Sequence, residues 1–146
     1  MGTWQGTGEG QFPTIAPFTY REILEVSEGQ TETLLQYQQR SWRDKDSEAV
    51  ASHMELGFIR LRDDESIDLL NVQGSDRVEV LNGAAVVRGG TLSIELNSVA
   101  LAHDERMIRS WRKLQLDGDS LRYSMGMATR RVPEGALHLS ANLTRQ

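Results

Sequence analysis

Apolar and polar residues alternate along much of this chain with a period of two, which is typical of β-strands whose successive side chains face opposite sides of a sheet. Residues 91–97 (TLSIELN) alternate strictly, with three apolar residues on one face. Residues 112–127 (RKLQLDGDSLRYSMGM) alternate on both sides of Asp117-Gly118, a dipeptide that favours tight hairpin turns. The pattern therefore predicts neighbouring antiparallel strands.

Further strands are expected wherever similar short runs lie between turn residues. These runs cover residues 34–42, 51–61, 77–80 and 137–143. Turns are expected at Asn82-Gly83, Gly89-Gly90 and Asp44-Lys45-Asp46. Only residues 20–26 carry a weak helical pattern. Eight to ten short strands predict an all-β fold, an antiparallel barrel or sandwich, and the chain length predicts a single domain over residues 1–146.

The glycine-rich segment GTWQGTGEGQFPTI, residues 2–15, raises the question of a nucleotide-binding loop. Gly6, Gly8 and Gly10 have the spacing G-x-G-x-G, whereas a dinucleotide fingerprint needs G-x-G-x-x-G ahead of a helix. Pro13 would block the interior of such a helix. In a strand, the three glycines would share one face without side chains, which leaves room for a neighbouring strand or a tryptophan, or for a flat ligand.

Composition limits the classes of partner. A net charge of −5 and a pI near 5.2 argue against nucleic acid, which needs a basic surface. No apolar run approaches the roughly 20 residues that cross a membrane, and no signal-peptide pattern opens the chain, so a cytoplasmic location is expected. The absence of cysteine excludes disulfides, thiolate metal sites and covalent haem attachment.

The segment GTWQGTGEGQFPTIAPFTYRE, residues 2–22, resembles the opening signature of the nitrobindin family, G-x-W-x-G-x-G-x-G-x-[FY]-P-T-I-x-x-F-x-Y-x-E. The similarity continues through residues 37–42, 53–60, 116–129 and 138–143. It implies an antiparallel ten-stranded β-barrel shaped like a fatty-acid-binding protein. It also implies a b-type haem held by one axial histidine, whose ferric iron binds nitric oxide and isomerises peroxynitrite to nitrate.

The resemblance also implies the site residues. The axial ligand of the family falls on His138, and a family methionine beside the pocket falls on Met127. Thr14 matches a turn next to the haem, and His53 matches a histidine that faces the haem edge or a propionate. Ordinary structural roles stay open for all of these: a core position for Met127, turn hydrogen bonding for Thr14 and an exposed strand position for His53.

One feature of the strand around His138 conflicts with a role as an iron ligand. Strict alternation over residues 137–143 places Leu137 and Leu139 on one face and His138 on the other. A bulge, or the end of the strand at Gly135, would be needed to turn the histidine toward the lumen. The segment RRVPEGA just before it carries an apparent insertion relative to the family.

Three hypotheses follow for the function. The first is a haem-binding barrel that interacts with nitric oxide and isomerises peroxynitrite, which leaves open whether this chain is an enzyme. The alternative is a carrier of a fatty acid or another small apolar ligand in the barrel cavity, without haem. The third is an interaction domain with a closed lumen. The sequence does not distinguish a monomer from a homodimer.

Overall fold

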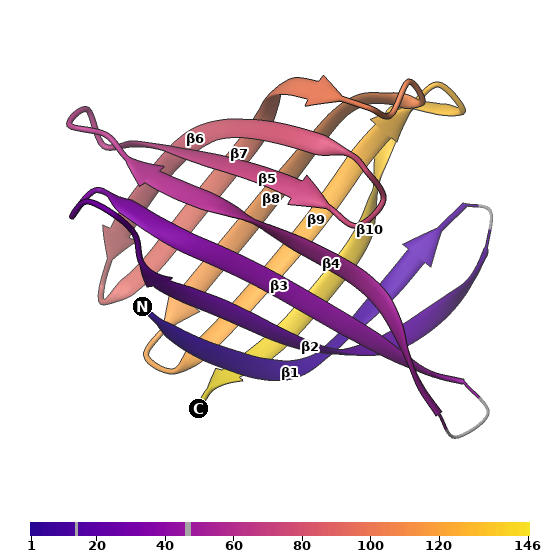
Figure 1. Ribbon diagram of the computed structural model, residues 1–146, viewed down its shortest axis with the longest axis horizontal. Helices are drawn as coiled ribbons and strands as arrows, with labels where there is room; N and C mark the ends of the chain where they lie inside the picture. The colour runs from indigo at the N-terminus through magenta and orange to yellow at the C-terminus, as the bar shows by residue number, and fades with distance from the viewer. Residues whose placement is uncertain (14, 46–47) are drawn as a thin grey trace.

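Ten antiparallel strands form a closed barrel in a computed structural model that describes residues 1–13, 15–45 and 48–146 (Figure 1). The strands are β1 (Gly2–Phe12), β2 (Ile15–Glu28), β3 (Leu34–Lys45), β4 (Glu48–Leu61), β5 (Ser66–Gln73), β6 (Val78–Arg88), β7 (Thr91–Ala102), β8 (Met107–Asp117), β9 (Ser120–Thr129) and β10 (Val132–Arg145). Each strand pairs with its neighbours in the chain, and β1 pairs with β10 to close the barrel. The predicted antiparallel ten-stranded barrel is confirmed. No helix in the described ranges is long and apolar enough to cross a membrane.

Two local predictions from the sequence are wrong. The weakly helical residues 20–26 lie inside β2, where they pair with β1 and β3. Asn82-Gly83 is not a turn but lies inside β6. A Cβ atom at Gly83 would come within 1.7 Å of the carbonyl oxygen of Glu95 on β7, so this glycine permits close approach of two strands.

The other predicted turns differ in outcome. Gly89 and Gly90 join β6 to β7 with φ angles of +57° and +86°, and Gly118 joins β8 to β9 with a φ of +55°, a region that glycine occupies without strain. Of the turn expected at residues 44–46, Asp44 still belongs to β3 and Asp46 lies outside the described residues.

The alternating glycines of β1 make room for aromatic side chains from β2. A Cβ atom at Gly8 would lie 2.3 Å from the ring of Tyr20, and one at Gly10 would lie 2.3 Å from the ring of Phe18. The face without side chains is therefore covered by the neighbouring strand, as in the first of the two interpretations, but the rings are those of Phe18 and Tyr20 and not of a tryptophan.

The barrel interior divides into two cavities and a buried polar layer between them. Strand β8 crosses all three parts: Trp111 lines one cavity, Arg112 lies in the middle, and Leu114 lines the other cavity. We call the first cavity the histidine pocket, because it includes His138, and the second the apolar chamber, which lies toward the end of the barrel where Met1 is found. The polar belt is the layer of buried residues Tyr20, Glu22, Tyr37, Gln39, Glu55, Glu79, Arg112 and Tyr123.

Candidate functional site

His138 reaches the barrel interior because β10 bulges at this residue. Leu137 pairs with Gly126 of β9 and Leu139 pairs with Met125, so His138 is an additional residue without a partner in the register. The bulge interrupts the alternation expected from the sequence: Leu137 is 54% exposed, whereas His138 is only 4% exposed. Strict alternation would turn His138 away from the lumen, and a bulge, the first of the two explanations considered, turns it inward.

The hydrogen bonding of His138 defines which ring nitrogen is available to a ligand. Its Nδ1 lies 2.7 Å from the carbonyl oxygen of Ala136, which can only accept, so Nδ1 carries the proton and donates. In the neutral ring, Nε2 then keeps its lone pair. The contacts of the described residues give Nε2 no protein partner. This arrangement is the one that a metal-binding imidazole requires.

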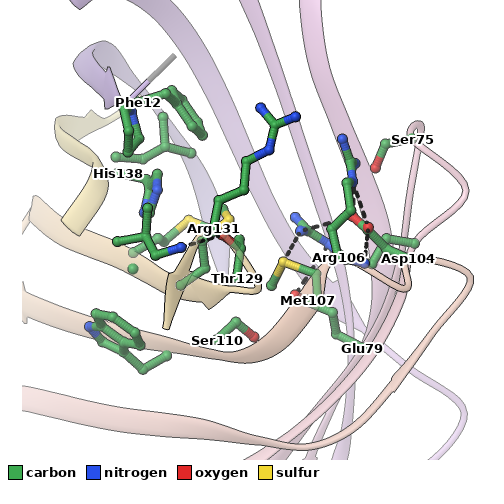
Figure 2. A pocket seen from close by; sticks show the side chains of 18 of the residues that line it. Phe12, Ser75, Glu79, Asp104, Arg106, Met107, Ser110, Thr129, Arg131 and His138 are labelled. Carbon is green, nitrogen blue, oxygen red and sulfur yellow. Dashed lines mark hydrogen bonds and ion pairs between the residues drawn. The ribbon is translucent and has the colours of Figure 1, made fainter. Parts of the chain in front are cut away.

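Aromatic packing holds the imidazole in place. The ring of Phe12, at the end of β1, lies beside the ring of His138 with centroids 4.9 Å apart and an angle of 53° between the planes (Figure 2). Phe12 in turn stacks on Phe18 of β2 at 6.0 Å. Phe18 occupies the space that Gly10 leaves open. The glycine-rich first strand therefore supports the histidine through two aromatic rings.

The histidine pocket has a volume of about 600 Å³, within the range of roughly 300–1,000 Å³ found for small-molecule sites. Its walls include Met125, Met127 and Leu139 beside the histidine. Trp111 of β8 also lines it, and its indole lies where a Cβ atom of Gly126 would fall, 2.1 Å from a ring carbon. An apolar wall of this kind keeps water away from a bound group.

The rim of the pocket is rich in arginine. Arg106, Arg130 and Arg131 all line it. The Nε atom of Arg106 lies 2.9 Å from a carboxylate oxygen of Asp104, and the Nε atom of Arg130 donates to the carbonyl oxygen of Glu105 at 2.7 Å. Figure 2 shows Asp104 and Arg106 across the pocket from His138 and Phe12. The rim therefore offers several cations to an anionic group.

The floor of the pocket is the half of the polar belt that contains Arg112. Its guanidinium donates to Glu55, with Nη2 at 2.9 Å from Oε2, and also to Glu79 at 2.8 Å. Burial alone would raise the pKa of Glu55, but the neighbouring Arg112 holds this pKa well below its ordinary value. Tyr37 donates a hydrogen bond to Glu55. This half of the belt is a buried, charged and paired cluster.

The other half of the belt centres on Glu22. Tyr123 donates to its carboxyl group, and the side-chain amide of Gln39 donates to it at 2.8 Å. Without a cation in direct contact, burial raises the pKa of Glu22 from 4.5 to about 7. Burial also raises the pKa of Tyr20, whose hydroxyl lies 2.9 Å from that of Tyr123. This half of the belt therefore changes its charge near neutral pH.

The structure brings three of the four residues implied by the resemblance into one pocket. His138 of β10, Met127 of β9 and His53 of β4 all line the histidine pocket. His53 is also 3.5 Å from Glu55 through Nε2, so it touches the polar belt. Thr14 lies outside the described residues.

Several residues of the site were missed by reasoning from the sequence. Phe12 lies in the segment matched to the family, without a role being assigned to it, and Trp111 lies outside every segment that was matched or predicted as a strand. Arg112 had a visible signal, because it falls on the same alternating face as Leu114 and Leu116. A charged residue on an otherwise apolar strand face indicates a buried ion pair. Its partners, Glu55 and Glu79, come from distant strands.

Comparisons with known proteins agree with this geometry. Residues 1–145 match the family described as "THAP4-like, heme-binding beta-barrel domain". An Arabidopsis thaliana protein named peroxynitrite isomerase Rv2717c is 32% identical over 133 residues, which cover 91% of this chain and 77% of that protein. Peroxynitrite isomerase 1 of Mycobacterium tuberculosis is 31% identical over 100% of this chain and 90% of its own length. The crystal structure of Rv2717c from M. tuberculosis superposes with a TM-score of 0.91 at 28% identity, over 100% of this chain and 92% of that one.

Proposed function

This chain belongs to the THAP4-like, haem-binding β-barrel family, and from that membership we propose that His138 holds a b-type haem in the histidine pocket through Nε2. The observation that carries the proposal is the hydrogen bond from Nδ1 to the carbonyl oxygen of Ala136, at 2.7 Å. It leaves the Nε2 lone pair for iron, as in other proteins with a proximal histidine.

The residues around His138 fit a haem in size, polarity and charge. The cavity of about 600 Å³ is walled by the side chains of Met125, Met127 and Leu139. Haem carries two propionates, and the arginines of the rim are suited to carboxylates because a guanidinium donates two parallel hydrogen bonds. The chain has no cysteine, so the haem would be held without covalent bonds.

We further propose that the haem-loaded protein isomerises peroxynitrite to nitrate and binds nitric oxide. Relatives over nearly the full chain length carry the name peroxynitrite isomerase, which supports the reaction. A ferric haem held by His138 would supply Lewis-acid chemistry toward the anionic substrate and a site for nitric oxide.

The residues of this chain would contribute in three ways. His138 would hold the haem iron through Nε2, and Phe12 limits the rotation of its ring. The apolar wall beside the histidine excludes water from the pocket. The cationic side chains of the rim favour the approach of an anion, so the rate should fall as ionic strength rises.

Two measurements test the proposal in sequence. Titration of the purified protein with ferric haem should give a Soret band that saturates at one haem per chain, and a pyridine haemochrome spectrum should identify haem b. Stopped-flow mixing with peroxynitrite should then show decay that accelerates with the concentration of haem-loaded protein, with nitrate as the product. A Soret titration without saturation, or decay no faster than with the haem-free protein, would contradict the proposal.

A further inference from the structure

We propose that the apolar chamber is a second ligand site, which takes the acyl chain of a medium-chain fatty acid tail first. It lies at the opposite end of the barrel from the histidine pocket and does not depend on the function proposed for that pocket. The two sites would be filled independently in one molecule.

The chamber is a true cavity in the barrel interior. Its volume is about 370 Å³, whereas protein interiors are normally packed with few voids larger than a water molecule. The lining is mostly aliphatic and includes Leu24, Ile67, Ile94, Leu96 and Leu116, with polar residues of the belt at its inner end. The volume is near the lower limit of roughly 300–1,000 Å³ for small-molecule sites, which favours a chain of medium length.

The polar belt separates the chamber from the histidine pocket. Its hydrogen bonds join strands on opposite sides of the barrel: Tyr123 of β9 donates to Glu22 of β2, and Arg112 of β8 donates to Glu55 of β4. Arg112 and Met125 line both cavities, so they lie at the boundary. A ligand that fills the chamber therefore ends at the belt and does not reach His138.

The charges of the belt determine the orientation of the ligand. Arg112 already donates through Nη1 and Nη2 to Glu55 and Glu79, while Glu22 adds a third carboxyl group. The Nε–H of Arg112 has no acceptor among the described residues, but this one guanidinium already balances two carboxylates, so a fatty-acid carboxylate at this depth would add a further acid without a further cation. The acyl tail should therefore point toward the belt and the carboxylate toward the mouth.

The mouth of the chamber suits an anionic head group. Met1 and Leu61 line the chamber and are 58% and 41% exposed, so the cavity reaches solvent there. Trp4 also lines it, and the guanidinium carbon of Arg145 lies 5.6 Å from the centre of the Trp4 ring. The Nε1 atom of Trp4 is buried without an acceptor among the described residues. A carboxylate at this level would provide that acceptor and lie near a cation.

Calorimetric titration with sodium decanoate tests the site, using the protein both as purified and after loading with haem. Saturable binding at one decanoate per chain is expected in both forms. Ile94→Trp and Leu116→Phe, on β7 and β8, fill the chamber and should weaken binding roughly tenfold or more. Leu56→Trp is the matched control, because Leu56 is 48% exposed and lies outside the chamber, and it should leave decanoate affinity unchanged. A cooperative urea-unfolding transition like that of the wild type shows that each variant is folded.

Nuclear Overhauser effects in the wild-type protein decide the orientation and do not depend on any variant folding. The terminal methyl of decanoate should contact Ile94 and Leu96, while the methylene next to the carboxylate should contact residues near Met1. The proposal is overturned if decanoate does not saturate, if it displaces haem, if the filled and control variants bind it equally, or if the methyl contacts lie at the mouth.

Discussion

The two ends of the barrel interior are built from the same ten strands but differ in chemistry. The histidine pocket holds an imidazole with a free lone pair, thioether side chains and a rim of arginines. The apolar chamber is lined by aliphatic side chains up to the polar belt. The difference shows that a closed barrel can present two separate environments along one lumen when a buried polar layer divides it.

The belt makes this division possible because its charges pair with one another. Glu55, Glu79 and Arg112 are each at most 4% exposed, and buried charges are tolerated only when they are paired and hydrogen-bonded. Glu22 lies in the same layer without a cation in direct contact, and its raised pKa makes it the carboxyl group of the belt that titrates near neutral pH. Removing one member of this buried ion-pair cluster should therefore weaken ligand binding in both cavities. A substitution in one cavity should leave ligand binding in the other unchanged.

Removing the central cation should have the largest effect. Arg112→Leu leaves the carboxylates of Glu55 and Glu79 buried without their partner, and loss of one member of a buried ion pair typically costs about 3–5 kcal/mol. We expect the free energy of unfolding, measured with urea, to fall by about that amount. Both haem and decanoate binding should weaken together. Wild-type stability in this variant would show that the belt is not a structural divider.

The protonation of Glu22 should produce a smaller, pH-dependent effect. Because its pKa rises from 4.5 to about 7 on folding, the folded state binds the proton more tightly, so stability is highest at low pH and declines as pH rises from 4.5 to 7. Glu22→Gln removes this titration. Between pH 5 and pH 8, the wild type should lose about 2 kcal/mol relative to the variant in urea unfolding. A parallel pH dependence for the two proteins would contradict the raised pKa.

Phe12→Ala should affect one end of the barrel alone. The ring of Phe12 lies 4.9 Å from that of His138 and limits its rotation. Loss of a residue that orients a metal ligand typically costs about 10–100-fold in affinity. We expect a decrease of about tenfold in haem affinity from Soret titration, and no change in decanoate affinity. A loss of decanoate binding would mean that the two ends are coupled.

The smallest effect is expected beside the belt, on the outer surface. Lys113 follows Arg112 in β8, but its side chain faces solvent and pairs with Glu95 at 3.1 Å. Exposed ion pairs contribute about 0–1 kcal/mol. Lys113→Met should therefore change the free energy of unfolding by less than about 1 kcal/mol and leave both ligands bound. Comparison with Arg112→Leu isolates the effect of burial.

The barrel was predictable from the sequence because alternation is a local signal. Residues 91–97 and the hairpin at Asp117-Gly118 are recognisable without knowing their partners. The turn predicted at Asn82-Gly83 was wrong because the reason for Gly83 is not local. The dipeptide favours turns, but this glycine allows close contact with Glu95 on another strand. A tertiary contact of this kind leaves no local pattern.

The site was predictable only in part. A family resemblance pointed to His138, but a period of two cannot reveal a bulge, which depends on how β10 pairs with Gly126 and Met125 of β9. Of the polar belt, a single segment signals only the burial of Arg112, on the same strand face as Leu114 and Leu116, and not the partners of that residue. The core of the belt joins Glu55, Glu79 and Arg112, and their meeting depends on the register of strands far apart in the sequence.

The central claim, that Nε2 of His138 is the iron ligand, is tested most directly by replacing the imidazole and then supplying it from solution. His138→Gly should show no saturable Soret band with ferric haem, and added imidazole should restore the band. His103→Ala, at an exposed histidine outside the pocket, should keep the wild-type titration. A wild-type Soret band in His138→Gly without imidazole would contradict the claim.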